Sequence, residues 1–385
     1  MKCMTGRHSE LVHTPEGVRD IYGDEYAKKL RVENLILEKV RSYGYEDIQT
    51  PAFEFFDVFS KEVGTTPSRE LYKFFDKEGN TLVLRPDFTP SIARCAAKYF
   101  ADCSVPIRFC YVGNTFTNTS DLQGKLKEAT QMGAELIGDS STEADGEMAA
   151  LVIEALLAAG LKDFQLSVGN VEYFKGLCME AGLDEETELE LREFISGKNY
   201  FGAEELLREK KVPEKYGDAL LKVTDLFGTY EALEQAKAFV HNERSLGAIR
   251  RLEALYEVLC CYGVESYVSF DLGMLSKYRY YTGVIFKAYT YGVGDAIVKG
   301  GRYDTLLGRF GKEAPAIGFA VVIDDLMAAL GRQNVEIPLL PGTETIEYTE
   351  ESYKEMLEKA KSLRAEGKKA VLVPQGKTEE RTEKG

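Results

Sequence analysis

The stretch KEATQMGAE carries the side chains best suited to bind a small molecule. Successive residues of a strand point to opposite faces, so Gln131, Gly133 and Glu135 share one face of the strand predicted here. The small Gly133 leaves open space between the amide and the carboxylate. Burying a carboxylate is costly unless it is paired, so an inward-facing Glu135 is expected to meet a cationic group. A solvent-exposed strand with the same residues is the alternative.

Two other motifs offer an acid, a hydroxyl and aromatic rings. In LRPDFTP, Asp87 and Thr89 follow the end of a predicted strand, and a salt-bridged strand end is the competing interpretation. In YRYYTGVIF, Tyr280 and Tyr281 supply flat faces and hydroxyls. Consecutive strand residues face opposite ways, so at least one of these tyrosines should belong to the core. Together these residues indicate a pocket lined by acids and tyrosines, which suits a small cationic or amino-bearing ligand.

Other common kinds of site are not indicated. The stretch VKGGRYDTLLGRFG has a Gly-Gly turn that lets the backbone approach a ligand, but it matches neither usual phosphate-binding loop. The three histidines, His8, His13 and His241, have no metal-ligand spacing, and the seven cysteines form no C-x-x-C motif. No serine, cysteine or histidine sits in a recognisable nucleophile setting. We therefore expect neither a metal nor a cofactor.

Composition narrows the class of protein further. A chain of 385 residues exceeds one ordinary core, so two or three domains are expected. The formal charge of −15 disfavours a nucleic-acid-binding protein, because the field of the whole molecule would repel phosphate backbones. No apolar run approaches the length that a bilayer requires, and the first residues lack the apolar core of a signal peptide. The odd number of cysteines suits a reducing compartment, so the expected location is the cytoplasm.

The elements that must position the candidate residues are those of an α+β domain. A helix is predicted at about 24–43, followed by a strand that ends at Pro51. The segment SIARCAAKYF reads as a helix that begins after Pro90. The segments IRFCYVGNTF and KEATQMGAELIG predict two antiparallel strands joined by a polar loop, residues 117–127. Strands and helices without regular βαβ alternation favour an antiparallel sheet flanked by helices.

Changes in composition and in the spacing of apolar residues along the chain predict its domain organisation. Residues 1–170 and 263–330 are expected to form one discontinuous core domain. Residues 171–262 are charged, with apolar residues at helical spacing, which indicates an inserted helical module. Residues 331–385 are expected to hold a Pro/Gly linker, a small α/β remnant and a polar, disordered tail.

The motifs occur in an order that resembles one known family. TPEGVRD, GYEDIQTPAFE, LRPDFTP, YVGNTF with GKLKEATQMGAELIG, YYTGVIF, GGRYDTLL and AIGFAVVIDDL follow one another as in histidyl-tRNA synthetase, a class II synthetase. The resemblance runs from about Thr14 to Leu330, most of the chain. It implies a six-stranded antiparallel sheet flanked by helices, a helical insertion before the tyrosine motif, and a dimer.

Three positions depart from that family, and they are the positions of its catalytic arginines. The resemblance places those arginines at Thr117, at Ser276 and at Asp325, where an acid stands instead. Adenylation develops negative charge at a phosphate, and fixed cations that stabilise such charge are usually the largest catalytic contribution. The loss of one such donor typically lowers the rate about a hundredfold or more. No catalytic residue of a synthetase is therefore expected here.

The same departures resemble a non-catalytic relative, the regulatory subunit of short-form ATP phosphoribosyltransferase, which also carries RPD-x-TP. The resemblance implies a subunit that is not itself an enzyme and that joins a short catalytic subunit in a hetero-oligomer, expected to be a hetero-octamer. It also implies histidine feedback on the first step of histidine biosynthesis. Such a subunit would keep an amino-acid pocket and dispense with the cations of a reaction it no longer performs.

Carried over position by position, the resemblance assigns a histidine pocket. Asp87 and Thr89 would face the amino group of the ligand, with Gln131 assisting. Glu135 and Tyr281 would contact the imidazole. Tyr280 is a further candidate for the same pocket. The arginine replaced by Thr117 helps to hold the carboxylate of the amino acid in the synthetase, so the affinity for histidine is expected to be weak.

Two other functions compete with this interpretation. The chain could be a residual amino-acid-activating enzyme in which Lys277 and Arg279 substitute for the replaced arginines. It could also be a tRNA-sensing module, which the net charge and the short C-terminal part disfavour.

Overall fold

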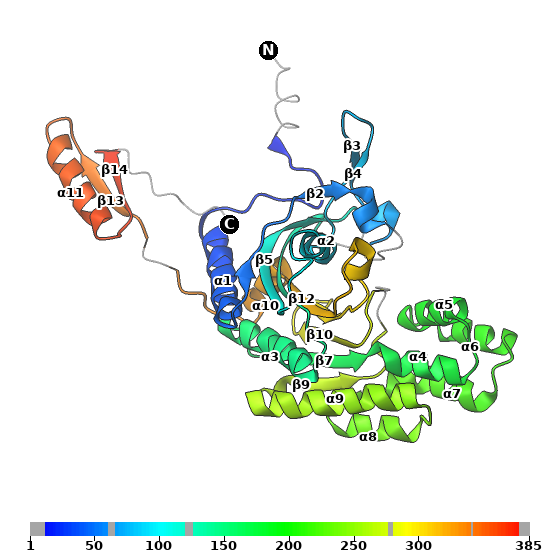
Figure 1. The fold of residues 1–385 in the computed structure, drawn as a ribbon. Helices are drawn as coiled ribbons and strands as arrows, with labels where there is room; N and C mark the ends of the chain where they lie inside the picture. The colour runs from blue at the N-terminus through cyan, green and yellow to red at the C-terminus, as the bar shows by residue number, and fades with distance from the viewer. Residues whose placement is uncertain (1–11, 61–65, 120–125, 276–279, 340–341, 377–385) are drawn as a thin grey trace, which may run out of the picture. The chain divides into compact units, whose positions relative to one another are not determined.

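The computed structural model describes residues 12–60, 66–119, 126–275, 280–339 and 342–376 (Figure 1). The chain divides into two compact units. The first unit comprises the N-terminal residues up to Ile21 together with Val32–Glu336, and it contains the candidate site. The second unit comprises Tyr22–Arg31 and the segment from Ile337 onward. None of the described helices has the length and apolar character needed to cross a membrane.

A large sheet forms the centre of the first unit. Its strands, in spatial order, are β1 (Glu46–Asp47), β5 (Ile107–Phe116), β6 (Glu128–Ile137), β12 (Ala316–Val322), β11 (Val298–Arg302), β10 (Val284–Thr290), β7 (Phe164–Asn170), β9 (Val268–Asp271) and β8 (Phe227–Gly228). Within the run of six strands from β5 to β7, every pair of neighbouring strands is antiparallel. The six-stranded antiparallel sheet implied by the resemblance is thus confirmed. β1 and β9 extend it by parallel pairing, and β8 follows β9 at that edge.

The part of the chain that leads into the candidate motif LRPDFTP forms a small three-stranded sheet. Its order is β2 (Phe53–Phe55), β4 (Thr81–Leu84) and β3 (Lys73–Phe75), with both pairings antiparallel. Directly after β4 the chain enters α2 (Thr89–Tyr99), which has Pro90 in its first turn. A proline is tolerated there because a backbone N–H at that position has no partner within the helix. This sequence of strand, turn and helix places Asp87 and Thr89 at the start of α2.

Local sequence signals account for where several helices begin. α1 (Gly23–Ser42) matches the helix predicted at about 24–43. α3 (Thr142–Ala158) begins after Ser141, whose side chain accepts a hydrogen bond from the N–H of Ala144 and so caps the helix. α3 packs against β12 and β11, and α10 (Ile323–Arg332) continues directly from β12.

Residues 171–262 are mostly helical. The helices are α4 (Val171–Glu180), α5 (Glu185–Ser196), α6 (Tyr200–Glu209), α7 (Glu214–Lys222), α8 (Glu231–Ala238) and α9 (Glu243–Tyr262). α4, α5, α6 and α9 each follow an Asn or Asp whose side chain accepts a backbone N–H in the first turn. The short strand β8 lies within this segment, pairs with β9 and was not predicted. α9 packs against α3, which ties the helical segment to the core.

The second unit has its own small βαβ motif. β13 (Glu344–Tyr348) pairs in parallel with β14 (Ala370–Pro374) through five residues. α11 (Tyr353–Ala365) connects the two strands and packs on both. Its Ala360 and the strand residue Ile346 are buried, so the motif has a small apolar core.

Candidate functional site

Glu135 lies at the centre of the sheet and is nearly inaccessible, with 1% of its surface exposed. Its Oε1 accepts a hydrogen bond of 2.7 Å from the hydroxyl of Thr89, at the start of α2. Its Oε2 accepts one from the hydroxyl of Tyr303, which follows β11. Among the described residues, no lysine or arginine forms an ion pair with this carboxylate. Two hydroxyls satisfy the oxygens, and no described residue supplies the cationic group expected beside Glu135.

The burial of Glu135 changes its protonation. Removal from water raises the pKa of this carboxyl to about 8, against an ordinary value of 4.5. The hydroxyls of Tyr303 and Thr89 stabilise the charged form and oppose this rise, while the nearby Asp87 adds to it. This carboxyl titrates close to neutral pH, so a ligand that brings an N–H donor or a positive charge would stabilise its ionised form.

Asp87, Thr89 and Gln131 surround the same point. Asp87 Oδ1 accepts a hydrogen bond of 3.2 Å from the backbone N–H of Thr89. Burial raises the pKa of Asp87, whereas backbone N–H groups of Thr89 and Phe88 and the Gln131 side chain lower it. Gln131 Nε2 donates to the hydroxyl of Tyr111 over 3.4 Å. The structure thus brings together the acid, hydroxyl and amide that the sequence assigned to one pocket.

Two glycines set the space around the carboxylate. Gly318 of β12 lies directly opposite Glu135 of β6, and a Cβ atom on Gly318 would lie 1.6 Å from Oε2 of Glu135. A Cβ atom on Gly133 would lie 2.0 Å from the carbonyl oxygen of Phe319 and 2.6 Å from the Tyr111 hydroxyl. The prediction that Gly133 leaves open space is therefore wrong. This glycine instead allows the neighbouring strand and the Tyr111 ring to approach closely.

The two candidate tyrosines both belong to the aromatic wall of the site. Neither lies in a strand, since β10 begins at Val284, so the alternation expected for consecutive strand residues does not apply. Their ring centroids are 4.7 Å apart. The buried Tyr280 also meets the ring of Tyr303 edge-on at 5.9 Å, and Tyr281 packs against the same cluster.

Tyr303 and Tyr111 were missed by the sequence reasoning. Tyr303 stands in GGRYD, a stretch considered only for its glycines. The available clue was its position directly after a strand that contains two glycines, because such small residues leave room for a bulky ring from a neighbouring segment. Tyr111 is paired with Gly133 across β5 and β6, and a large residue opposite a glycine was the available clue.

Comparison with known proteins identifies the group. A family model described as histidyl-tRNA synthetase matches residues 17–326. A protein of Acetivibrio thermocellus named ATP phosphoribosyltransferase regulatory subunit is 42% identical over 92% of this chain and 85% of its own length. A protein of the same name from Thermoanaerobacter pseudethanolicus is 40% identical over 93% of each chain. The chain belongs to the family of ATP phosphoribosyltransferase regulatory subunits.

Solved structures agree with membership of this regulatory-subunit family. A crystal structure titled ATP phosphoribosyltransferase regulatory subunit/histidyl-tRNA synthetase, from Bacillus halodurans C, matches with a TM-score of 0.86. It is 36% identical and covers 96% of this chain and 94% of its own. Histidyl-tRNA synthetase from Nostoc sp. PCC 7120 matches with a TM-score of 0.78 at 20% identity, over 94% of this chain and 86% of its own, and shows the shared fold.

In this regulatory-subunit family member, two of the three positions assigned to lost arginines are described. Thr117 follows β5, and its N–H donates to the carbonyl of Lys127 over 2.9 Å. Asp325 lies in the first turn of α10, beside Asp324, whose carboxylate accepts the N–H of Thr130. Ser276 falls outside the described residues, as do Lys277 and Arg279. At both described positions the side chain is one that cannot neutralise a phosphate.

The raised pKa of Glu135 predicts a specific pH dependence of stability. In the unfolded chain this carboxyl loses its proton near pH 4.5, whereas in the folded protein it holds the proton until about pH 8. Between these values the folded state binds more protons, so Glu135 makes the free energy of unfolding fall as the pH rises. Glu135→Gln should flatten this fall in denaturant titrations between pH 5 and 8.

The matched control is Glu143→Gln, which changes an exposed glutamate in the first turn of α3. This control should keep the slope of the unmodified protein. Equal slopes for Glu135→Gln and the unmodified protein would show that Glu135 titrates normally.

Proposed function

We propose that this chain is the non-catalytic regulatory subunit of a short-form ATP phosphoribosyltransferase. It activates a separate catalytic subunit and enables histidine feedback in the first step of histidine biosynthesis. The relatives that share about 40% of its residues over most of its length carry the name of that subunit. The observation that carries the proposal is a buried site with Glu135 at its centre, retained without the arginines of a synthetase.

The retained pocket is proposed to bind histidine. The ligand's ammonium group faces Asp87 and Thr89, with Gln131 assisting, and its imidazole meets Glu135 and Tyr281. Tyr280 and Tyr303 complete the wall, since the first packs on the second and the second donates to Glu135. An imidazole N–H or a positive charge at Glu135 favours the ionised carboxylate, so binding near neutral pH releases a proton.

The same site is poorly suited to adenylation. A synthetase of this fold needs cations where negative charge develops on the α-phosphate, and Thr117 and Asp325 supply none. Asp325 adds a negative charge at one of these points. A residual amino-acid-activating enzyme would depend on Lys277 and Arg279, and a tRNA-sensing module would work against the net charge of −15. No observation favours either function over the regulatory one.

The proposal includes the assembly and its location. The chain associates with itself as a dimer and with the short catalytic subunit as a hetero-octamer, in the cytoplasm. The proposed domain organisation is the one inferred from the sequence. Residues 1–170 and 263–330 form the core, which holds the histidine pocket. The helical segment 171–262 is inserted between these two parts.

Reconstitution tests the proposed function directly. The purified chain alone should show neither phosphoribosyl transfer nor histidine-dependent pyrophosphate exchange. Mixing it with a short catalytic subunit should produce phosphoribosyl transfer, and histidine should inhibit the mixture. Glu135→Gln should leave activation in place and make inhibition require at least about tenfold more histidine, the loss expected when a charge-assisted hydrogen bond is removed.

Two results would contradict the proposal. One is a mixture that remains inactive although both subunits are folded. The other is histidine-dependent pyrophosphate exchange by the chain alone, which would establish the amino-acid-activating enzyme instead.

A further inference from the structure

The ring of Tyr281 lies over a row of glycines that leads across the sheet to Glu135. Glu135 of β6 is opposite Gly318 of β12, and Gly318 is opposite Gly301 of β11. A Cβ atom on Gly301 would come within 2.9 Å of Cε1 of Tyr281, so the ring rests directly on this strand. Residues opposite one another on neighbouring strands share a face of the sheet. Tyr281 and Glu135 therefore border the same space, and a shift of the ring changes the shape of that space.

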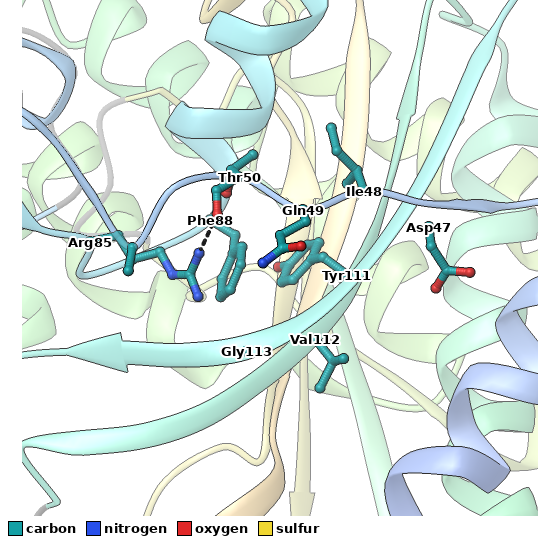
Figure 2. A pocket seen from close by; sticks show the side chains of 10 residues that line it. Asp47, Ile48, Gln49, Thr50, Arg85, Phe88, Tyr111, Val112 and Gly113 are labelled. Carbon is teal, nitrogen blue, oxygen red and sulfur yellow. Dashed lines mark hydrogen bonds between the residues drawn. The ribbon is translucent and has the colours of Figure 1, made fainter.

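The other aromatic wall of the site is held by residues that precede the helical segment. Tyr111 accepts a hydrogen bond from Gln131, and its ring stacks on Phe88 with 4.3 Å between centroids (Figure 2). The guanidinium of Arg85 lies over the Phe88 ring at 3.9 Å and donates to the carbonyl of Thr50 at 2.9 Å (Figure 2). This wall is thus supported from within the core.

The support of Tyr281 comes in part from the helical segment 171–262. Val171, the first residue of α4, forms a buried cluster with Met274 and Ile285, and the ring of Tyr281 packs against this cluster. The N–H of Val171 also donates to the carbonyl of Gly283 at 3.0 Å, two residues beyond Tyr281. One residue of the segment therefore contacts both the cluster behind the ring and the backbone next to it.

Met274 is held in place by a second part of the same segment, residues 223–228. The strand β8 within this part pairs with β9. Just before β8, the carbonyl of Leu226 accepts the N–H of Leu272 at 3.0 Å. The next residue is a glycine, and a Cβ atom on it would lie 2.7 Å from Cα of Thr224. The two backbones are thus in direct contact, and residues 223–228 determine where the chain runs immediately before Met274.

We propose that the helical segment 171–262 positions Tyr281 and thereby sets the affinity of the pocket for histidine. This inference rests on the proposed histidine pocket. Val171 and Met274 act through Tyr281, so they are positioning residues. Coupling between two sites is reciprocal. Histidine that holds Tyr281 in place must therefore also stabilise the contact between residues 223–228 and 271–274, and occupancy of the pocket is expressed at the helical segment.

A pair of valine substitutions tests the positioning role. Val171→Ala removes two methyl groups from the cluster behind Tyr281 and should weaken histidine binding about two- to thirtyfold in calorimetric titration, the usual size of such coupling. The matched control is Val240→Ala, which changes a similarly buried valine of the same segment outside this cluster. This control should bind histidine as the unmodified protein does. The comparison separates a loss of positioning from a general loss of packing.

Hydrogen exchange of the unmodified chain, followed by mass spectrometry, gives a second measurement that a merely structural role would not change. Histidine should slow amide exchange in residues 223–228, because opening this contact becomes more costly. Exchange in α6, which packs on α5 and α7, should stay the same.

The outcomes distinguish this proposal from the pocket on which it rests. Equal histidine affinity in Val171→Ala and Val240→Ala, or exchange in residues 223–228 that histidine leaves unchanged, would overturn the positioning role and leave the pocket standing. An unmodified chain that binds no histidine would overturn the pocket and this proposal with it.

Discussion

Asp145→Asn is expected to lower the free energy of unfolding by about 3–5 kcal/mol, the usual cost of breaking a buried ion pair by changing one partner. Asp145, in the first turn of α3, is completely buried. Its Oδ1 accepts from Arg302 Nε at 2.8 Å, and its Oδ2 accepts from Arg251 Nε at 2.7 Å. Asparagine keeps the shape but removes the counter-charge of Arg251 and leaves Arg302 with Asp304 as its remaining acidic partner. Denaturant titration at neutral pH measures the loss.

A second acid–arginine pair, on the helix α9 that carries Arg251, supplies the control. Glu243 and Arg250, both on α9, form an ion pair in which both side chains are mostly exposed. Glu243→Gln should therefore change the free energy of unfolding by no more than about 1 kcal/mol. A stability of Asp145→Asn equal to that of the unmodified protein would mean that this network contributes nothing to holding α9 against the core.

Gly318→Ala is expected to abolish histidine binding and to destabilise the protein by at least about 3 kcal/mol, the upper end of the usual cost of overpacking. The added methyl would occupy the position of the Glu135 carboxylate, at 1.6 Å from Oε2, and would lie 2.8 Å from the carbonyl of Ala134. The backbone of β6 cannot move away without breaking its pairing with β12. Calorimetric titration with histidine and denaturant unfolding measure the two effects.

Gly331→Ala is the matched control for this substitution. Gly331 lies in α10, and a Cβ atom there would meet nothing within 4 Å. Because alanine favours a helix over glycine, the stability should stay the same or rise by up to about 1 kcal/mol. Unchanged histidine binding in Gly318→Ala would show that the ligand does not use the space around Glu135.

Residues that act within one strand or one turn could be predicted from the sequence. Alternation along a strand was enough to place Gln131 and Glu135 on the same buried face. The helix that follows LRPDFTP was also predictable, and with it the position of Thr89. These predictions depend on neighbours that are close in the chain.

The remaining parts of the site depend on pairings between distant segments. Which groups satisfy Glu135 was not predictable, because Tyr303 reaches it only through the registers of β11 and β12. The role of Gly133 was misjudged for the same reason, since the atoms that crowd it belong to Phe319 and Tyr111. The contact between Tyr280 and Tyr281 depends on a turn before β10 and not on strand alternation.

The connectivity of the central sheet also determines when the site forms during folding. β6 pairs with β12, so that Gln131 lies opposite Val322, and more than half the length of the first unit separates these partners in the chain. Closing so long a loop is slow compared with forming a local hairpin such as β5–β6. A nascent chain is therefore expected to form this hairpin early and to complete the proposed histidine pocket only after the segment that ends in β12 has been made and has docked.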